Sequence, residues 1–333
     1  MVNVWRNLPL KAKIGVVLFG AFLLAAIIGP MVEPYDPGQV NMNPALSMNS
    51  PSAQHLLGTT QTGQDVLSQL LTGIRLTIIV ALVVGVIATT LSVLIGVTAA
   101  FLGGIWDEML SLFTNVVLVI PALPLLIVLL GYMASQGQTP TIIVLALLGW
   151  PWGARVIRAQ TLTIRNRDFI AASRESGEKT WRIIVFEIIP NEVSLIAANF
   201  VNTVLYAIGA SVALAFAGLT DLTSWSLGTM LYWAQTDQAV QLGAWWWFVP
   251  PGLAVAFIGT ALVLLNSGID ELGSPRLRAS RGAAKVAGHR VWATDPTPVL
   301  AQLSATRGRL ATFLYSFSRA SLLDETTAGG ELR

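Results

Sequence analysis

The stretch LTIIVALVVGVIATTLSVLIGVTAAF, residues 76–101, carries no acidic, basic or histidine side chain. A helix needs roughly 20 consecutive apolar residues to cross a bilayer, because the hydrocarbon core is about 30 Å thick. The stretch exceeds that length. It therefore predicts a transmembrane helix, and with it a membrane protein.

Five further apolar stretches occur along the chain. The stretch 141–153 is short and needs its flanks to complete a span. The five stretches are 14–32, 112–133, 141–153, 193–217 and 245–265. We therefore predict an all-α integral membrane protein with six transmembrane helices in residues 14–275. A short N-terminal segment, 1–13, precedes them, and a C-terminal extension, 276–333, follows.

The composition supports this class. Of the 333 residues, 54% are hydrophobic and 11% are charged, whereas a soluble domain has about 25% charged residues. The chain has no cysteine and only two histidines, His55 and His289, so neither a disulfide nor a His/Cys metal site is expected. Arg6, Lys11 and Lys13 precede the first span, as in a secretory signal, but the apolar run is too long and no A-x-A site follows it.

The basic residues indicate which ends of the spans face the cytoplasm, because cytoplasmic loops are enriched in Lys and Arg. All but Arg75 of the 20 basic residues fall in three segments: before the first span, in the loop 154–192 and after the sixth span. Six spans place these three segments on one side. We therefore expect a multi-pass protein with both termini in the cytoplasm and with the loops 33–75 and 218–244 outside.

The most polar stretch of the cytoplasmic loop is AASRESGEKTWRIIVFEIIPN, residues 171–191. Asn166 or Asp168 can cap a first helix, which ends before Gly177. Pro190 disfavours helix at the residue before it and so limits a second helix. Apolar residues recur on one face of that second helix at Trp181, Ile184, Val185 and Ile188. The stretch thus predicts two short amphipathic helices joined by a glycine turn.

This stretch resembles the cytoplasmic coupling loop of binding-protein-dependent ABC importer permeases. The family pattern is roughly E-A-A, three residues, G, about ten residues, and then I/L-L-P. The corresponding residues here are Ala171, Ala172, Ser173, Gly177, Ile188, Ile189, Pro190 and Asn191. Ala171 replaces the usual glutamate and Ser173 the second alanine, while the spacing of the glycine and the proline is kept.

A second stretch, LGTTQTGQDVLSQLLTGIR at residues 57–75, is similar to L-G-T-D-x-x-G-R-D-V-L-S-R-L-x-x-G-x-R. That segment precedes the second span in the oligopeptide/dipeptide type of the family. Thr60, Gln64 and Gln69 replace the usual Asp, Arg and Arg. The resemblance covers about residues 5–278. It implies the C-type permease subunit of a peptide importer in a bacterial cell membrane, with the type I ABC importer fold.

The resemblance also implies partners. In such importers two homologous permease subunits form the pathway within the membrane lipid, ABC ATPase subunits dock beneath them, and an extracytoplasmic binding protein delivers the substrate. ATP and Mg²⁺ bind to the ATPases, and this chain has no G-x-x-x-x-G-K-[ST] motif. We therefore expect a non-catalytic subunit without a cofactor or metal of its own and without a nucleic-acid partner. Coupling to the ATPases through residues 164–190 is implied for Ala171, Ala172, Ser173, Arg174, Glu175, Gly177 and Pro190.

Pro121 and Pro124 interrupt the third predicted span. A bend that lines the translocation path and a simple packing kink are both consistent with them. No ionisable side chain lies within the six spans as drawn, whereas ion-coupled carriers usually keep such residues at depth. The energy for transport is therefore expected to come from outside the bilayer.

Two alternatives stay open. Relatives of the peptide-type permeases move oligosaccharides or nickel, and one acid and two arginines of the family pattern are missing from residues 57–75. A membrane scaffold without transport activity is the alternative from a different class. In the C-terminal extension, apolar residues at helical spacing between 303 and 317 predict a basic amphipathic helix for lipid or an ATPase.

Overall fold

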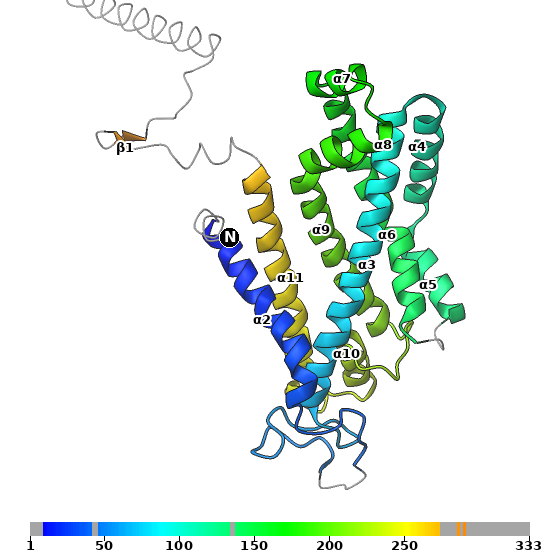
Figure 1. The fold of residues 1–333 in the computed structure, drawn as a ribbon. Coiled ribbons are helices and arrows are strands. Elements are labelled where there is room, and N and C mark those ends of the chain that lie inside the picture. The colour runs from blue at the N-terminus through cyan, green and yellow to red at the C-terminus, as the bar shows by residue number, and fades with distance from the viewer. Residues whose placement is uncertain (1–8, 42–45, 134–136, 274–284, 287–288, 291–333) are drawn as a thin grey trace, which may run out of the picture. The chain divides into compact units, whose positions relative to one another are not determined.

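The computed structural model describes residues 9–41, 46–133, 137–273, 285–286 and 289–290 (Figure 1). The chain divides into two units, Met1–Gly273 and Ser274–Arg333. The elements of the first unit are helices: α2 (Leu10–Val32), α3 (Val66–Leu102), α4 (Gly104–Val119), α5 (Ala122–Met133), α6 (Thr139–Arg165), α7 (Asp168–Glu175), α8 (Thr180–Ile183), η3 (Ile184–Ile188), α9 (Ile189–Phe216), α10 (Leu227–Thr236) and α11 (Trp245–Gly273).

The second unit contains one short hairpin among its described residues. Its strands β1 (Lys285–Val286) and β2 (His289–Arg290) pair antiparallel, with Lys285 opposite Arg290. The amphipathic helix predicted between 303 and 317 lies outside the described residues.

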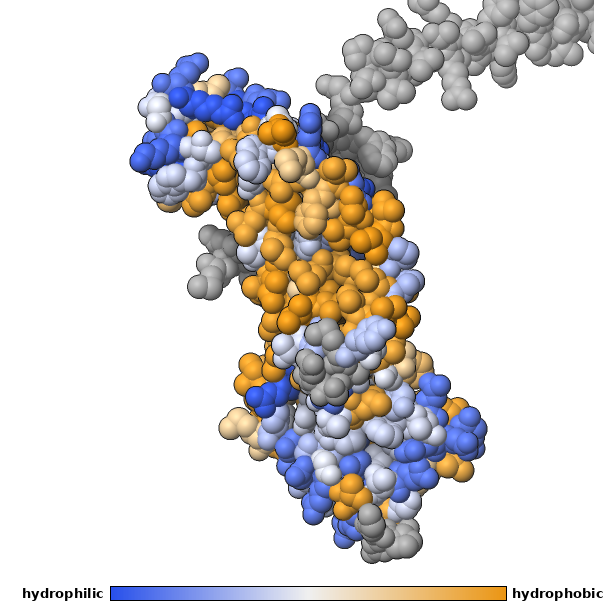
Figure 2. All heavy atoms as spheres, turned by 90° about the vertical axis from the view of Figure 1, so that its right-hand side faces the viewer, coloured by the Kyte–Doolittle hydropathy of each residue, from blue (hydrophilic) through white to orange (hydrophobic). Residues whose placement is uncertain are grey.

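Five helices of the described chain are long and apolar enough to cross a membrane, and the bent pair α4–α5 makes a sixth span. This confirms the all-α class with six membrane spans. Figure 2 shows the corresponding apolar band between two polar ends, with the end that carries α7 at the top.

Several helices are longer than their predicted spans. α6 continues to Arg165, so that residues 154–165 of the predicted loop are helical. α3 begins at Val66, before the predicted start at residue 76, and takes in part of the predicted outer loop. A run of apolar residues marks only the part of a helix that lies in hydrocarbon. The helix can continue beyond that run, because long basic side chains reach the interface while their backbone stays helical.

α3 is the central helix of the first unit and packs against α6, α9 and α2. Glycines permit the close approach of α3 and α6: a Cβ atom at Gly96 would lie 2.6 Å from the Ala154 carbonyl oxygen. At Gly153 a Cβ atom would lie 2.5 Å from the side chain of Asn199 on α9. These glycines therefore serve helix packing, as small residues commonly do in membranes.

The 57–75 stretch builds the beginning of α3. The Asp65 side chain accepts hydrogen bonds from the Ser68 backbone nitrogen and hydroxyl, both at 2.8 Å, and so caps the helix. His55 Nδ1 lies 2.9 Å from the same carboxylate. Gly58 has a φ of +71° and a Cβ atom there would lie 2.5 Å from the Asn49 carbonyl oxygen, so only glycine fits. Asp65 and Gly58 of this stretch thus have structural roles at the start of α3.

The third span is broken between α4 and α5, which meet at 80°. α4 ends at Val119, and Pro121 follows in the gap before α5. Pro124 lies in the first turn of α5, where the missing N–H would be unpaired in any case. The expectation that both prolines interrupt the span is therefore corrected: the break is at Pro121 alone.

The outer ends of the helices are joined by the loops 33–65 and 217–244, and the second loop contains α10. Of the three consecutive tryptophans at 245–247, only Trp245 is largely exposed, at 54%. Trp247 is 2% exposed within an apolar cluster, and Trp246 Nε1 donates to the Thr59 carbonyl at 3.2 Å. The three therefore do not form an interfacial belt together, and two of them fasten the outer loops to α11.

Candidate functional site

The candidate site is the cytoplasmic segment between α6 and α9, residues 166–191, which we call the coupling segment. It begins at the end of α6 and contains α7, α8 and η3. Neither Asn166 nor Asp168 caps α7 with its side chain: Arg167 occupies the N-cap position, and Asp168 is the first helical residue. A carboxylate in the first turn and Arg174 in the last turn both suit the helix dipole.

Gly177 ends α7 in a Schellman motif. The Glu178 backbone nitrogen donates to the Ser173 carbonyl at 3.1 Å, and the Gly177 nitrogen donates to the Arg174 carbonyl at 3.0 Å. Gly177 has a φ of +77°, in the left-handed region that glycine adopts without strain. Among the described residues other than its two chain neighbours, none has a heavy atom within 4 Å of an added Cβ atom. The glycine is therefore required by its backbone conformation and not by close packing.

The second half of the segment departs from the prediction. α8, the π-helical turn η3 and α9 form one continuous helix, Thr180–Phe216. Pro190 does not limit this helix, because it sits at the start of α9 directly after the π turn. Wide π-helical turns inside α-helices often occur at functional sites. The coupling segment thus leads straight into a membrane span without an intervening loop.

Three isoleucines anchor the segment. Ile170 of α7, Ile183 of α8 and Ile188 of η3 are at most 2% exposed and pack in one cluster with Phe101 of α3 and Ile157 of α6. Burial of each such side chain contributes roughly 1.5–3 kcal/mol. The predicted apolar face is therefore partly wrong: Trp181 and Val185 are exposed, because the π turn changes which residues face inward.

Polar contacts complete the anchoring. The Ser173 hydroxyl lies 2.6 Å from Glu187 Oε1 and 3.0 Å from the Phe169 carbonyl oxygen, so it joins α7 to η3. The Arg174 guanidinium lies over the Phe101 ring at 4.7 Å from its centroid, a cation–π contact that is worth about 0.5–1 kcal/mol at an exposed site. α7 is thereby held against the ends of α3 and η3.

The structure brings most of the predicted coupling residues together on one short helix and its turn. Ala171, Ala172, Arg174, Glu175 and Gly177 are exposed. Ser173 is half-buried against Glu187, and Pro190 is exposed at the start of α9, on a different helix. The four large apolar side chains exposed nearby were not predicted as surface residues: Phe169, Trp181, Val185 and Phe186.

A groove of about 580 Å³ lies beside α7. The ends of α6 and α7 and the start of α9 line it, through Gln160, Ile164, Arg167, Asp168, Phe169 and Asn191. It gives the cytoplasmic end a concave surface next to the exposed helix. A convex partner element could fill it.

Sequence reasoning missed one buried acid at the root of the segment. Glu192 is 1% exposed in α9 and accepts a hydrogen bond at 2.8 Å from the Thr161 hydroxyl of α6, which is fully buried. Its other oxygen has no hydrogen-bond partner among the described residues. The predicted span 193–217 contains no acidic or basic residue. The observed helix α9 begins earlier, at Ile189, and therefore includes Glu192.

A second candidate site lies within the membrane region, next to the break after Pro121. It is a cavity of about 220 Å³ between α5, α6 and α9. Its lining residues are Ala122, Leu148, Gly149, Trp152, Gly153, Asn199, Asn202, Thr203 and Tyr206. Four of them, from Asn199 to Tyr206, recur at i, i+3, i+4 and i+7, so that a polar face in an apolar helix could have been found from the sequence. The cavity offers neutral hydrogen-bonding groups and no charge.

The two outer loops carry acids but no lysine or arginine. Burial opposes ionisation of Asp221, but hydrogen bonds from Ser224 and Thr223 outweigh it and lower the pKa of Asp221. Burial raises the pKa of Asp237, which lines a pocket of about 350 Å³ between the loops. Among the described residues, no three His, Cys, Asp or Glu side chains are placed to hold a metal ion.

Comparison with known proteins finds a matching family and several similar proteins. Residues 92–279 match the family described as binding-protein-dependent transport system inner membrane component. A putative peptide permease protein of Brucella suis biovar 1 is 32% identical over 277 residues, which are 81% of this chain and 89% of the relative. The oligopeptide transport system permease protein OppC of Bacillus subtilis is 28% identical, over 83% of this chain and 91% of the relative. The dipeptide transport system permease protein DppC of the same organism is 29% identical, over 83% and 86%.

Proposed function

Because the chain belongs to the family of binding-protein-dependent transport system inner membrane components, we propose that it forms half of the pathway of an ATP-driven peptide importer. The other half comes from a second, homologous permease subunit. An extracytoplasmic binding protein delivers the peptide, and ABC ATPase subunits supply the energy. The chain is a multi-pass membrane protein of this transporter family.

The structure of the coupling segment is the observation that supports this proposal most directly. It presents a short helix with an exposed face at the polar end of the membrane band, and buried isoleucines fasten that helix to α3 and α6. A helix that lies in a groove of a partner gains affinity from apolar side chains and orientation from charges. Trp181 and Phe186, at 59% and 64% exposure, supply the apolar contacts, and Arg174 and Glu175 supply the charges.

The continuity of the segment with α9 supports a mechanical role. A push on α7 reaches Glu187 through Ser173, and Glu187 lies in the π turn that begins the helix Thr180–Phe216. That helix carries the polar face of the membrane cavity. Movement of an ATPase could therefore reposition Asn199 and Tyr206 without an intervening flexible loop.

The membrane cavity supports a path for peptides. Its amide, hydroxyl and aromatic groups can hydrogen-bond to a peptide backbone or stack on side chains, and they carry no fixed charge that would select one sign of side chain. The break at Pro121 places Ala122 beside it. We assign Pro121 to the path and Pro124 to the first turn of α5.

The missing charges of the 57–75 stretch do not favour an oligosaccharide or nickel as cargo. Thr60, Gln64 and Gln69 are at most 8% exposed. Gln69 Nε2 donates to Gln64 Oε1 at 3.0 Å, and the Gln64 backbone nitrogen donates to Thr60 Oγ1 at 3.1 Å. The three residues thus form a neutral hydrogen-bonded network at the start of α3 and in the loop before it, and their burial gives them a structural role.

Uptake by the reconstituted transporter tests the proposal. The chain, its partner permease, the ATPases and the binding protein are placed in proteoliposomes with ATP inside. We expect ATP-dependent uptake of labelled di- to oligopeptides that unlabelled peptides suppress and that oligosaccharides and Ni²⁺ do not. Uptake of a sugar or of nickel in preference to every peptide would replace the peptide assignment, and a complex without any ATP-dependent uptake would support the scaffold.

A further inference from the structure

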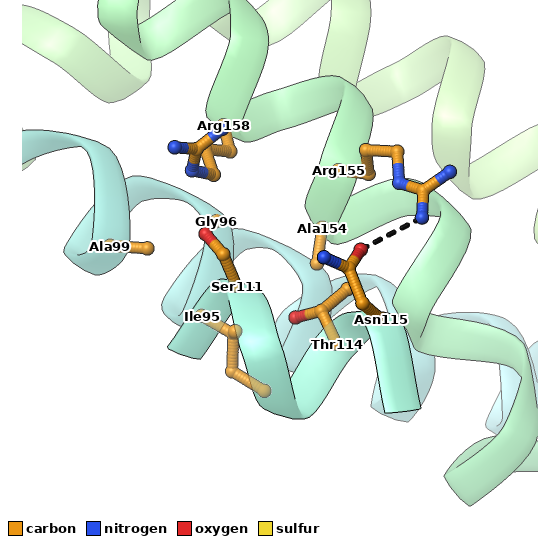
Figure 3. A pocket seen from close by; sticks show the side chains of 9 residues that line it. All are labelled: Ile95, Gly96, Ala99, Ser111, Thr114, Asn115, Ala154, Arg155 and Arg158. Carbon is orange, nitrogen blue, oxygen red and sulfur yellow. Dashed lines mark hydrogen bonds between the residues drawn. The ribbon is translucent and has the colours of Figure 1, made fainter. Parts of the chain in front are cut away.

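A cavity of about 200 Å³ lies where α3, α4 and α6 meet (Figure 3). α3 contributes a wall of small and apolar residues, whereas α4 and α6 contribute polar and basic ones. The lining residues are Ile95, Gly96, Ala99, Ser111, Thr114, Asn115, Ala154, Arg155 and Arg158. The coupling segment and the membrane cavity do not include these residues.

The two arginines differ in their partners. Arg158 makes a bidentate ion pair with Asp107, at 2.6 and 2.7 Å, so its charge is neutralised. Arg155 Nη2 donates at 2.8 Å to Asn115 Oδ1, a neutral acceptor, and among the described residues no carboxylate pairs with it. Figure 3 shows this contact between Arg155 of α6 and Asn115 of α4. The cavity therefore keeps one uncompensated positive charge.

The position of Arg155 along α6 fixes its depth. It follows Thr139, the first residue of α6, by 16 positions, which corresponds to about 24 Å along the helix axis. The hydrocarbon core is about 30 Å thick. Measured from an outer edge at Thr139, the Arg155 backbone lies about 6 Å short of the inner edge of the hydrocarbon. Its long side chain can extend from there toward the phosphates of the cytoplasmic leaflet.

An unpaired guanidinium at that level is costly unless an anion or water meets it. Phosphate is its best-matched partner, because it accepts two parallel N–H bonds. Asn115 uses its oxygen for Arg155, and its Nδ2, which donates no hydrogen bond within the described part of the chain, can donate to the same anion. On the adjacent surface of α4, Leu112, Phe113 and Val116 are more than half exposed, which suits acyl chains.

We propose that this cavity binds the phosphodiester headgroup of an anionic phospholipid of the cytoplasmic leaflet, held by Arg155 and Asn115. Basic pockets between transmembrane helices on the cytoplasmic side bind anionic headgroups for the same electrostatic reason. A bound lipid would cover the exposed side of α4 and fix it against α6. α4 leads directly to the break at Pro121, so the lipid would stabilise the broken span.

Three variants of the full-length chain, purified with its partner subunits, test the site. Arg155→Gln removes the charge. Asn115→Asp keeps the size of the side chain but supplies a carboxylate to Arg155, which neutralises the site without disturbing the fold. Lys11→Gln removes an exposed basic charge at the start of α2, a helix that does not line the cavity, and is the matched control.

The measurement is retention and titration of phosphatidylglycerol, phosphatidylcholine and inorganic phosphate by native mass spectrometry. Loss of a charge-assisted hydrogen bond weakens binding about tenfold or more. We expect preferential binding of phosphatidylglycerol by the wild type and Lys11→Gln, and a loss of at least that size in Arg155→Gln and Asn115→Asp. Equal binding of the two lipids, or unchanged phosphatidylglycerol binding in both cavity variants, would overturn the proposal. Saturation by inorganic phosphate that displaces the lipid would assign the cavity to a free anion instead.

Discussion

Replacement of Gly177 by valine is the perturbation whose effect follows most directly from the geometry. The residue has a φ of +77°. An L-residue held in the left-handed region costs about 1–2 kcal/mol, and a β-branched residue is the least suited to it. Apart from its chain neighbours, no residue in the described part of the chain has a heavy atom within 4 Å of the position of an added Cβ atom. The whole effect must therefore come from the backbone and not from a clash.

The cost of 1–2 kcal/mol lowers the ratio of native to rearranged turn roughly 5- to 30-fold. Because the turn is exposed, it can rearrange locally, so insertion into the membrane and assembly of the six spans should be preserved. We therefore expect Gly177→Val to reduce ATP-driven uptake by up to that factor. Gly177→Asn is the matched control, because asparagine tolerates this conformation and should keep most of the uptake.

The assay is uptake in proteoliposomes with equal amounts of inserted transporter, measured together with ATPase activity stimulated by the binding protein. The complex that contains Gly177→Val should retain basal ATP hydrolysis by the ATPases. The amount of peptide taken up per ATP hydrolysed should fall. Wild-type uptake by the valine variant would refute the reasoning. An equal loss in the asparagine variant would show that the side chain itself, and not the backbone conformation, matters at this position.

Three further predictions concern the anchoring, the outer loops and the exposed aromatic surface. Thr161→Val removes the hydrogen bond to the buried Glu192 and should destabilise the protein by about 1–3 kcal/mol in thermal unfolding, whereas Thr161→Ser should not; equal stability of all three proteins would contradict the contact. Asp221 and Asp237 should respond to substitution with opposite signs, because the pKa of Asp221 lies below its ordinary value of 3.8 and the pKa of Asp237 lies above it. At neutral pH, Asp221→Asn should lower the unfolding temperature and Asp237→Asn should raise it. The stability from Asp221 is present above pH 3.8 and is lost as pH falls through its lower folded pKa, and the penalty from Asp237 develops as pH rises from 3.8 through its higher folded pKa; shifts of the same sign would be inconsistent with these environments. Trp181→Ala should weaken copurification of the ATPase subunits by about 2 kcal/mol, the size typical of an interfacial tryptophan, and Trp181→Phe should weaken it less; undiminished copurification would remove this residue from the interface.

The membrane class could be predicted from sequence because it depends on local properties. The uncharged stretch around α3 has to lie in hydrocarbon, and the distribution of Lys and Arg orients it whatever the details of packing. The turn at Gly177 was also predictable, since one residue and its neighbours determine a Schellman motif. The motif at 57–75 was recognised from its pattern, but only the structure shows that Asp65 is a helix cap.

Features that depend on more distant contacts were missed. Pro190 predicts a limit to the second helix, yet a π-helical turn before it lets α8 continue into α9. The same turn moves Trp181 and Val185 to the surface, which a fixed period of 3.6 residues cannot represent. Glu192 was left outside its span because its partner, Thr161, belongs to a helix 31 residues earlier. A sequence window contains no information on such a pair.

The role of the coupling segment is the central claim, and the absence of cysteine from the chain allows a direct test. A single Ser176→Cys substitution places a thiol on the exposed turn beside Gly177, and Ser224→Cys places one in an outer loop as the control. Both variants are assembled with the partner subunits and treated with a short thiol-reactive photocrosslinker in the absence and presence of ATP. We predict crosslinking of residue 176 to an ATPase subunit with an ATP-dependent yield, and none from residue 224. Crosslinking of residue 176 only to lipid or to the other permease subunit would contradict the account.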